Sequence, residues 1–72
     1  MINTIIKFHK QLQKDECVKI ITGLRDYETY INRTDIIKQS SDILEIYRAS
    51  GAKVAINTNF IVSCCVIPEF LK

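Results

Sequence analysis

The sequence predicts a mainly β protein, in which an N-terminal α-helix precedes a five-stranded, strongly bent antiparallel small barrel. Apolar and polar side chains alternate with a period of two in several segments, and turn residues separate those segments closely. Short strands at such close spacing are typical of small barrels. The chain of 72 residues has the length of one domain, residues 1–72. The alternative fold is α+β, with a second helix at about 35–49.

Length, charge and cysteine content limit the classes of protein that fit this chain. A domain of this size buries only about 60% of the surface of its unfolded chain, and small domains commonly gain support from oligomerisation. The net charge of +2 permits an anionic partner without demanding one. Three cysteines, two of them adjacent, make no disulfide framework. We therefore expect a cytoplasmic protein with reduced thiols. We expect no membrane contact, because no apolar run approaches roughly 18 residues.

The first predicted element is a helix over residues 3–14. Asn3 or Thr4 can cap it, because either side chain can accept a hydrogen bond from a free backbone N–H. Its apolar residues recur at helical spacing, which favours packing over one side of a sheet. The residues predicted on its inner face are Ile5, Phe8 and Leu12.

Four segments are predicted to be strands from their period of two or their β-branched and apolar content. Gly23 ends the first of them and Pro68 stops the last. The last segment is continuously apolar, so we expect it to be buried on both faces or covered by a neighbour. The polar turn Asn57-Thr58-Asn59 precedes it. The four predicted strands are 17–22, 26–31, 53–57 and 60–67.

The segment 35–49 has two interpretations. As a helix it would be capped by Thr34 and followed by Gly51. As two strands it would turn at KQSSD, with Leu44 and Ile46 pointing inward. Two strands are favoured, because Ser-Ser-Asp side chains compete for backbone hydrogen bonds and weaken a helix.

The order of helix, strand, glycine, long bent strand and final hairpin resembles the Sm-like (Sm, LSm, Hfq) barrel, a relative in shape of SH3-like barrels. The positions that resemble its first motif are Val18, Ile20, Gly23, Asp35 and, four residues on, Gln39. The second motif resembles V-x-I-R-G-x-x-I. Here VAINTNFI matches it at Val54, Ile56 and Ile61, with Asn57 and Thr58 at the Arg-Gly positions.

This resemblance implies a non-catalytic binding module that contacts single-stranded RNA as a homo-oligomer. In the family, the loop after the second strand and the last turn line the pore of a ring and bind uridine- or adenine-rich RNA. By position, that role falls on Gln39, Asn57 and Thr58. The chain departs from the family because the Arg-Gly dipeptide and the Lys-His of the Hfq branch are absent.

Two further groups of residues carry binding predictions. Stacking rings and positive charges come together in one stretch, which indicates contact with nucleic acid; these residues are Arg25, Tyr27, Tyr30 and Arg33. The final strand is long, apolar and uncharged, and such an edge invites pairing with another chain. In Sm-like rings, edges of this kind pair between subunits. The residues predicted at this oligomer edge are Phe60, Val62, Cys64 and Val66.

No residue pattern indicates catalysis, so we expect no enzyme, no metal site and no cofactor. Structural zinc sites use cysteine pairs spaced by two to four residues, whereas Cys64 and Cys65 are adjacent and would point to opposite faces of a strand. Nothing in the sequence places an acidic partner beside His9. No glycine loop that cradles phosphate is present.

An alternative function is a small protein-interaction regulator or inhibitor of phage-like size. It would bind a larger host protein through its sheet edge or a tyrosine face, since tyrosine is favoured at interfaces. The residues of that face would be Tyr27, Tyr30 and Tyr47.

Overall fold

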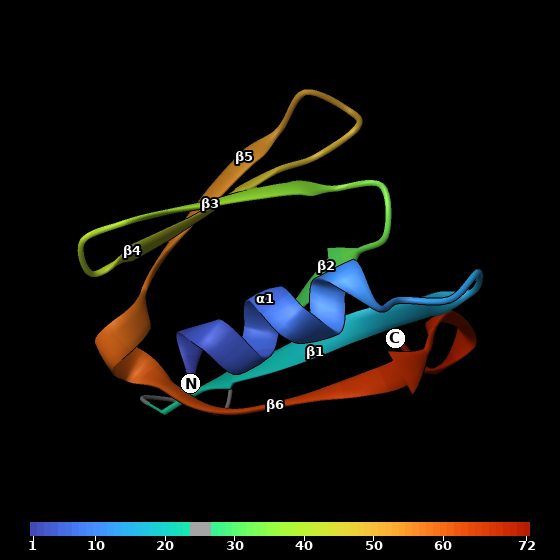
Figure 1. The fold of residues 1–72 in the computed structure, drawn as a ribbon, viewed down its shortest axis with the longest axis horizontal. Helices are drawn as coiled ribbons and strands as arrows, with labels where there is room; N and C mark the ends of the chain where they lie inside the picture. Colours follow the sequence, from blue (N-terminus) through green and yellow to red (C-terminus); the bar gives the residue numbers. More distant parts are fainter. Residues whose placement is uncertain (24–26) are drawn as a thin grey trace.

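The computed structural model describes residues 1–23 and 27–72 (Figure 1). It is mainly β with an N-terminal helix, as the sequence predicts. The elements in chain order are α1 (Ile2–Lys10), β1 (Glu16–Thr22), β2 (Tyr27–Asn32), β3 (Ile36–Ser40), β4 (Ile43–Tyr47), β5 (Lys53–Asn57), η1 (Thr58–Phe60), β6 (Ile61–Pro68) and η2 (Glu69–Leu71).

The strands form two antiparallel sheets, in the orders β2-β1-β6 and β3-β4-β5. The predicted five-stranded barrel is therefore not confirmed, since the six strands of the described residues form two sheets and do not close into a barrel. The long bent strand expected after Gly23 is broken between Asn32 and Ile36, so its two halves, β2 and β3, belong to different sheets. Among the described residues, no ladder joins one sheet to the other.

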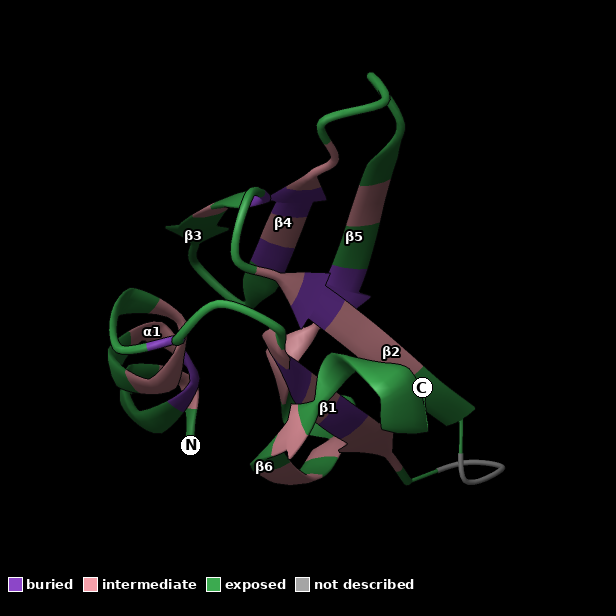
Figure 2. Cartoon of the chain, turned by 90° about the vertical axis from the view of Figure 1, so that its right-hand side faces the viewer, coloured by how far each residue is buried: buried purple, intermediate pink, exposed green. Residues whose placement is uncertain are grey.

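The hydrophobic core lies between the inner faces of the two sheets and the helix. The residues with no exposed surface in this core are Ile5 of α1, Val18 and Ile20 of β1, Ile31 of β2, and Leu44 and Ile46 of β4. Helix α1 packs against β1 and β6. In Figure 2 it lies at one side of the two sheets, whereas β2 and β5 lie at the other side, away from the helix. The core is thus covered by a helix on one side only.

The helix is shorter than predicted and begins earlier. Met1 is its N-cap residue and makes no side-chain cap, so the predicted cap at Asn3 or Thr4 is wrong; both residues lie inside the first turn. The helix ends at Lys10, and Asp15 adopts a left-handed φ of 70° just before β1. Leu12 is nevertheless buried at 8% exposure, because the turn after the helix folds back over the core.

The segment 35–49 is two strands, and the helix alternative is wrong. The turn between β3 and β4 contains Ser41 with a left-handed φ of 54°, followed by Asp42. Leu44 and Ile46 of β4 are fully buried, as the strand interpretation predicts. The short polar side chains therefore act as a turn rather than as a helix interior.

Of the two arrangements predicted for the last strand, burial on both faces is wrong, whereas β1 pairs with it and α1 packs against it. Strand β6 pairs with β1 along one side only and forms the edge of its sheet. Its residues are all half-buried or exposed, and Val62 and Val66 are 59% and 36% exposed. A continuous apolar sequence here belongs to an open edge, not to an interior strand.

A buried ion pair joins the end of β2 to the end of β4. Asp35, only 4% exposed, accepts hydrogen bonds from the Asn32 backbone N–H (2.8 Å) and from Nη1 of Arg48 (2.5 Å). Arg48 also donates to the Tyr30 carbonyl (2.5 Å). These bonds span the break between β2 and β3 and so help to position one sheet on the other.

Candidate functional site

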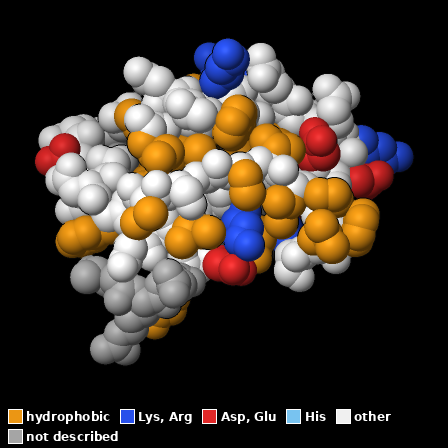
Figure 3. Space-filling view, turned by 90° about the horizontal axis from the view of Figure 1, so that it is seen from below, with side chains coloured by type: hydrophobic (Ala, Val, Ile, Leu, Met, Phe, Trp, Pro, Cys, Tyr) orange, Lys and Arg blue, Asp and Glu red, His pale blue; other side chains and the backbone are white. Residues whose placement is uncertain are grey.

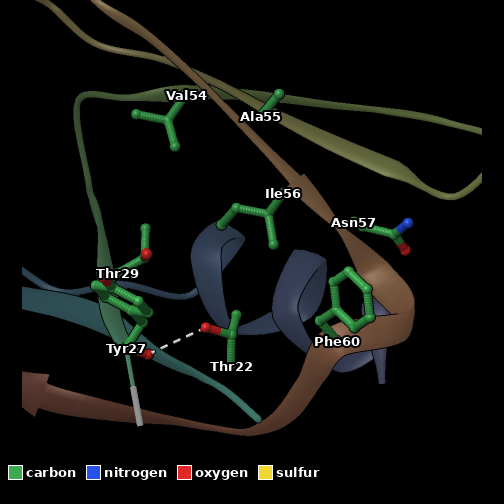
Figure 4. A pocket seen from close by; sticks show the side chains of 8 residues that line it. All are labelled: Thr22, Tyr27, Thr29, Val54, Ala55, Ile56, Asn57 and Phe60. Atoms are coloured by element: carbon green, nitrogen blue, oxygen red, sulfur yellow. Dashed lines mark hydrogen bonds between the residues drawn. The ribbon is translucent and has the colours of Figure 1, made fainter. Parts of the chain in front are cut away.

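A mostly apolar hollow of about 490 Å³ opens where the two sheets face each other away from the helix (Figure 4). One wall comes from the ends of β1 and β2, the opposite wall from β5, and the third from η1. The residues that line it are Thr22, Tyr27, Thr29, Val54, Ala55, Ile56, Asn57 and Phe60.

The period of two along the strands explains why these side chains meet. Thr22 is opposite Tyr27 and two positions beyond buried Ile20, so both point toward the inside of the fold. On β5, Ile56 is opposite buried Leu44 and points the same way. The hollow is therefore the open end of the core, on the side that α1 leaves uncovered.

Two aromatic rings border the hollow and remain open to solvent. Tyr27 is 64% exposed and Phe60 is 49% exposed. In Figure 4 their rings stand on either side of Thr22 and below Ile56. None of the described residues that line it carries a charge, so this part of the hollow suits a flat, largely apolar group that can stack on a ring.

The polar groups around the hollow mainly form hydrogen bonds to other parts of the same chain. The Thr22 hydroxyl donates to the Tyr27 carbonyl (3.4 Å), and the Gly23 N–H donates to the Phe60 carbonyl (2.8 Å). The Asn57 side-chain oxygen accepts from the Asn59 N–H (2.9 Å) and caps η1. That cap fixes the start of η1 and, with it, the position of Phe60.

No family model, curated protein or solved structure matches this chain. The site is therefore interpreted from its own geometry. Within residues 1–23 and 27–72, the structure contains no helix with the length and apolar character that a bilayer crossing requires. The same residues bring no three His, Cys, Asp or Glu side chains together as a metal ion would need.

The structure brings Gln39, Asn57 and Thr58 to one end of the second sheet. The Thr58 N–H donates to the Asp42 carbonyl (2.7 Å), which joins the β3–β4 turn to η1. Gln39 and Asn57 nevertheless lie on opposite faces: Gln39 is opposite buried Leu44, whereas Asn57 pairs with partly exposed Ile43 on the outer face. They do not form one amide pair around a single base.

The predicted stacking and basic residues are also dispersed. Tyr27 borders the hollow, whereas Tyr30 lies on the opposite face of β2 and donates its hydroxyl to Glu28 (2.6 Å). Arg33 is exposed between β2 and β3 and lines a separate, more polar hollow that also contains Glu69. Arg25 lies outside the described residues.

The predicted oligomer-edge residues divide between the hollow and β6. Phe60 belongs to η1 and lines the hollow. Val62 lies at the irregularity in the β1–β6 ladder, and Val66 is opposite buried Val18. Cys64 is half-buried, and burial raises the pKa of its thiol.

Each sheet carries the same cluster of charged and tyrosine side chains on its outer face. On β2, the Tyr30 hydroxyl and the Lys19 ammonium hold the pKa of Glu28 below its ordinary value. On the other sheet, Lys53 and then Tyr47 do the same for Glu45. The spacing Glu-x-Tyr, present at Glu28 and again at Glu45, is the sequence signal that could have indicated these clusters.

A second hollow of about 290 Å³ lies between α1 and the second sheet and includes Gln39 and His9. The Nε2 atom of His9 is 3.2 Å from the Asn32 carbonyl, so the ring contributes to the packing of α1. Thr22 and Thr29 are not among the site residues that the sequence predicts, and Phe60 is predicted only at the oligomer edge, not at the hollow between β2 and β5 that it lines. Only pairing across the core reveals them, since Phe60 lies in η1 and the two threonines lie on β1 and β2.

Proposed function

We propose that the protein is a non-catalytic, Sm-like binding module that contacts single-stranded RNA and works as a homo-oligomer. The observation that carries the proposal is the hollow between β2 and β5, where the exposed rings of Tyr27 and Phe60 border an uncharged, apolar space. Unpaired bases bind proteins mainly by stacking on aromatic side chains. A duplex does not present its bases in this way.

A positive charge near the hollow suits weak binding of a nucleic-acid backbone. Lys53 begins β5, one residue before Val54 of the hollow, and its side chain is 53% exposed. Because none of the described lining residues is charged, we expect stacking to supply most of the binding free energy. We therefore expect the affinity to fall with added salt, with a shallow slope.

Replacing the ring at the hollow tests this proposal. Tyr27→Ala should weaken binding of fluorescein-labelled oligo-U or oligo-A RNA by about tenfold, since stacking on an aromatic ring contributes about 1–3 kcal/mol per base. Fluorescence anisotropy at low ionic strength measures it. Failure of both RNAs to bind the unaltered protein would overturn the proposal.

Two control variants separate the hollow from other surfaces. Tyr47→Ala removes a tyrosine from the outer face of the second sheet and should leave RNA affinity unchanged. Gln39→Ala should also have little effect, because Gln39 lies on β3, at the opposite edge of that sheet from β5, and lines the separate hollow beside α1. If Gln39→Ala abolished RNA binding and Tyr27→Ala retained it, RNA would instead bind near Gln39, at the position of the RNA-binding loop in Sm-like proteins.

The alternative of a regulator that binds a larger host protein through a tyrosine face has weaker support. Tyr27 borders the hollow, Tyr30 lies on the outer face of the first sheet, and Tyr47 lies on the outer face of the second. Three tyrosines on separate surfaces offer no single face to a partner.

A further inference from the structure

We propose that two copies of this chain join by antiparallel self-pairing of β6, with Cys65 of each copy meeting at the two-fold axis. This inference rests on the oligomeric part of the proposed function and names its surface, geometry and partner. The partner is a second copy, and the result is a closed dimer with one continuous sheet of six strands.

The first argument compares the edge strands of the two sheets. Each sheet has two edges, β2 and β6 in one, β3 and β5 in the other. Glu28 lies on β2, Lys38 on β3 and Lys53 on β5. Charges of this kind protect edges from pairing with other chains. Strand β6, IVSCCVIP, is the longest of the four edge strands and carries no charge, so it is the edge suited to a partner.

The second argument concerns which strand pairs with β6. In an antiparallel ladder, the backbone N–H and C=O groups of two opposed residues either both point toward the partner strand or both point away from it. Successive residues along one strand alternate between these two orientations. When a strand pairs with its own copy, one residue must therefore lie opposite itself. Such a pairing uses the same edge twice and closes. Pairing of β6 with a charged edge such as β5 would leave a free β6 at the end of the assembly.

The third argument fixes the register. The β1–β6 ladder is regular from Glu16 opposite Pro68 to Ile21 opposite Ser63, and it becomes irregular beyond Ile21. Cys65 lies near the middle of the regular part. With Cys65 opposite itself, Ser63 meets Ile67 of the second copy.

The same register places apolar side chains against each other on the inner face. Cys64 and Val66 both lie on that side of β6, opposite Ile20 and Val18 of β1. In the dimer, Val66 of one copy meets Cys64 of the other, which covers a valine that is 36% exposed in the single chain. Apolar pairs opposed in this way stabilise antiparallel sheets.

The pairing predicts a specific covalent link. Opposed residues in adjacent antiparallel strands have Cβ atoms about 4.5–5.5 Å apart, close to the separation that a disulfide requires. Diamide, which oxidises two thiols to one disulfide, should therefore convert the protein to a dimer that dithiothreitol reverses. Cys64→Ala should still form this dimer on a non-reducing gel, and Cys65→Ser should not.

A charge on the edge should separate the copies. Val66→Lys places two lysines beside the two-fold axis and should change the mass measured by light scattering from two chains to one, with loss of the diamide-linked dimer. Ile36→Lys is the matched control. It places the same charge at an apolar residue of β3 that is 61% exposed, and the dimer should persist. Circular dichroism verifies that both variants fold.

Several results would overturn this inference. A single-chain mass for the unaltered protein at high concentration would do so, as would assemblies larger than two chains. A diamide link that persists in Cys65→Ser would place the axis elsewhere. The outcome is independent of RNA, since Tyr27→Ala should remain a dimer while losing RNA affinity. Failure of either proposal can therefore be recognised separately.

Discussion

Arg48 extends from the end of β4 to two groups at the end of β2, the Asp35 carboxylate and the Tyr30 carbonyl. Its side chain is 22% exposed and that of Asp35 only 2%. Removing one member of such a pair leaves a charge with little access to water, which costs more than the pair itself contributes. The free energy of unfolding should therefore depend strongly on this arginine.

Arg48→Met should lower the free energy of unfolding by about 3 kcal/mol, because it keeps the apolar length of the side chain and strands the Asp35 carboxylate. Chemical denaturation followed by circular dichroism measures the loss. Lys53→Met is the matched control, since it breaks the exposed pair with Glu45 and should change stability little. Equal losses in the two variants would contradict this role for Arg48.

At the scale of single residues, the sequence predicts where a residue lies along the chain's strands and turns better than which other residues it meets. Tyr27 and Asn57 do border the hollow, and Thr58 lies next to it in η1. Gln39 and Asn57 lie on opposite faces of the second sheet. This depends on the two-residue turn between β3 and β4, which sets the register of the whole sheet. The Asp35–Arg48 pair joins residues far apart in sequence, where periodicity carries no information.

At the scale of elements, periodicity places the strands within about a residue. The helix boundaries were less predictable, because Asn3 is a plausible cap wherever the first turn begins, and Met1 takes that position instead. The edge position of β6 was predicted from its apolar, uncharged sequence, whereas its exposure within the single chain was not. An apolar strand looks the same in sequence whether its second neighbour is present within the chain or supplied by another copy.

The junction between β1 and β6 provides a test at this scale. A Cβ atom at Gly23 would stand 2.7 Å from Cγ2 of Val62, closer than side chains approach. Gly23→Ala should therefore destabilise the protein by about 0.5–1.5 kcal/mol, the cost of forcing the exposed Val62 side chain away from its preferred rotamer. Thermal and chemical unfolding of the variant measure this cost.

Val62→Ala should relieve that clash. Val62 is 59% exposed, so its truncation alone should have a small effect. The double variant should recover most of the stability lost in Gly23→Ala, giving a coupling free energy that a double-mutant cycle measures. Strictly additive losses would mean that the strain at Gly23 has another source.

At the scale of the whole molecule, the two sheets carry matching clusters on their outer faces. The first contains Lys19, Glu28 and Tyr30. The second contains Glu45 and Lys53. Seen from below, the molecule shows acidic and basic side chains among hydrophobic ones (Figure 3). Hydrogen bonds lower the pKa of both glutamates and raise that of both lysines.

These shifts give stability a defined pH dependence. A lowered carboxyl pKa contributes stability that is fully present above the ordinary value of 4.5 and is lost as the pH falls through the lower, folded-state value. The raised lysine pKa values contribute below 10.5 and lose that contribution as the pH rises through the folded-state values. Stability should therefore decline at both extremes, and between them these groups contribute a plateau.

Substitution can show which groups cause the loss of stability at low pH. Glu28→Gln with Glu45→Gln should flatten the decline of the unfolding midpoint between about pH 5 and about pH 3, because neither amide binds a proton there. Thermal unfolding across that range checks it. An undiminished slope in the double variant would assign the acid loss to other groups.

The pairing of β1 with β6 has a consequence for how the chain folds. The strands of the second sheet follow each other through short turns, whereas the β1–β6 ladder joins Glu16 to Pro68. Closing so long a loop in a flexible chain costs about 2 kcal/mol more in entropy than closing a hairpin. We therefore expect the β3–β4, β4–β5 and β1–β2 hairpins to form at low cost, and their formation shortens the loop that β6 must close. The uncharged edge strand is then the last to join its sheet, and until it does, the central strand β1 is itself an open edge.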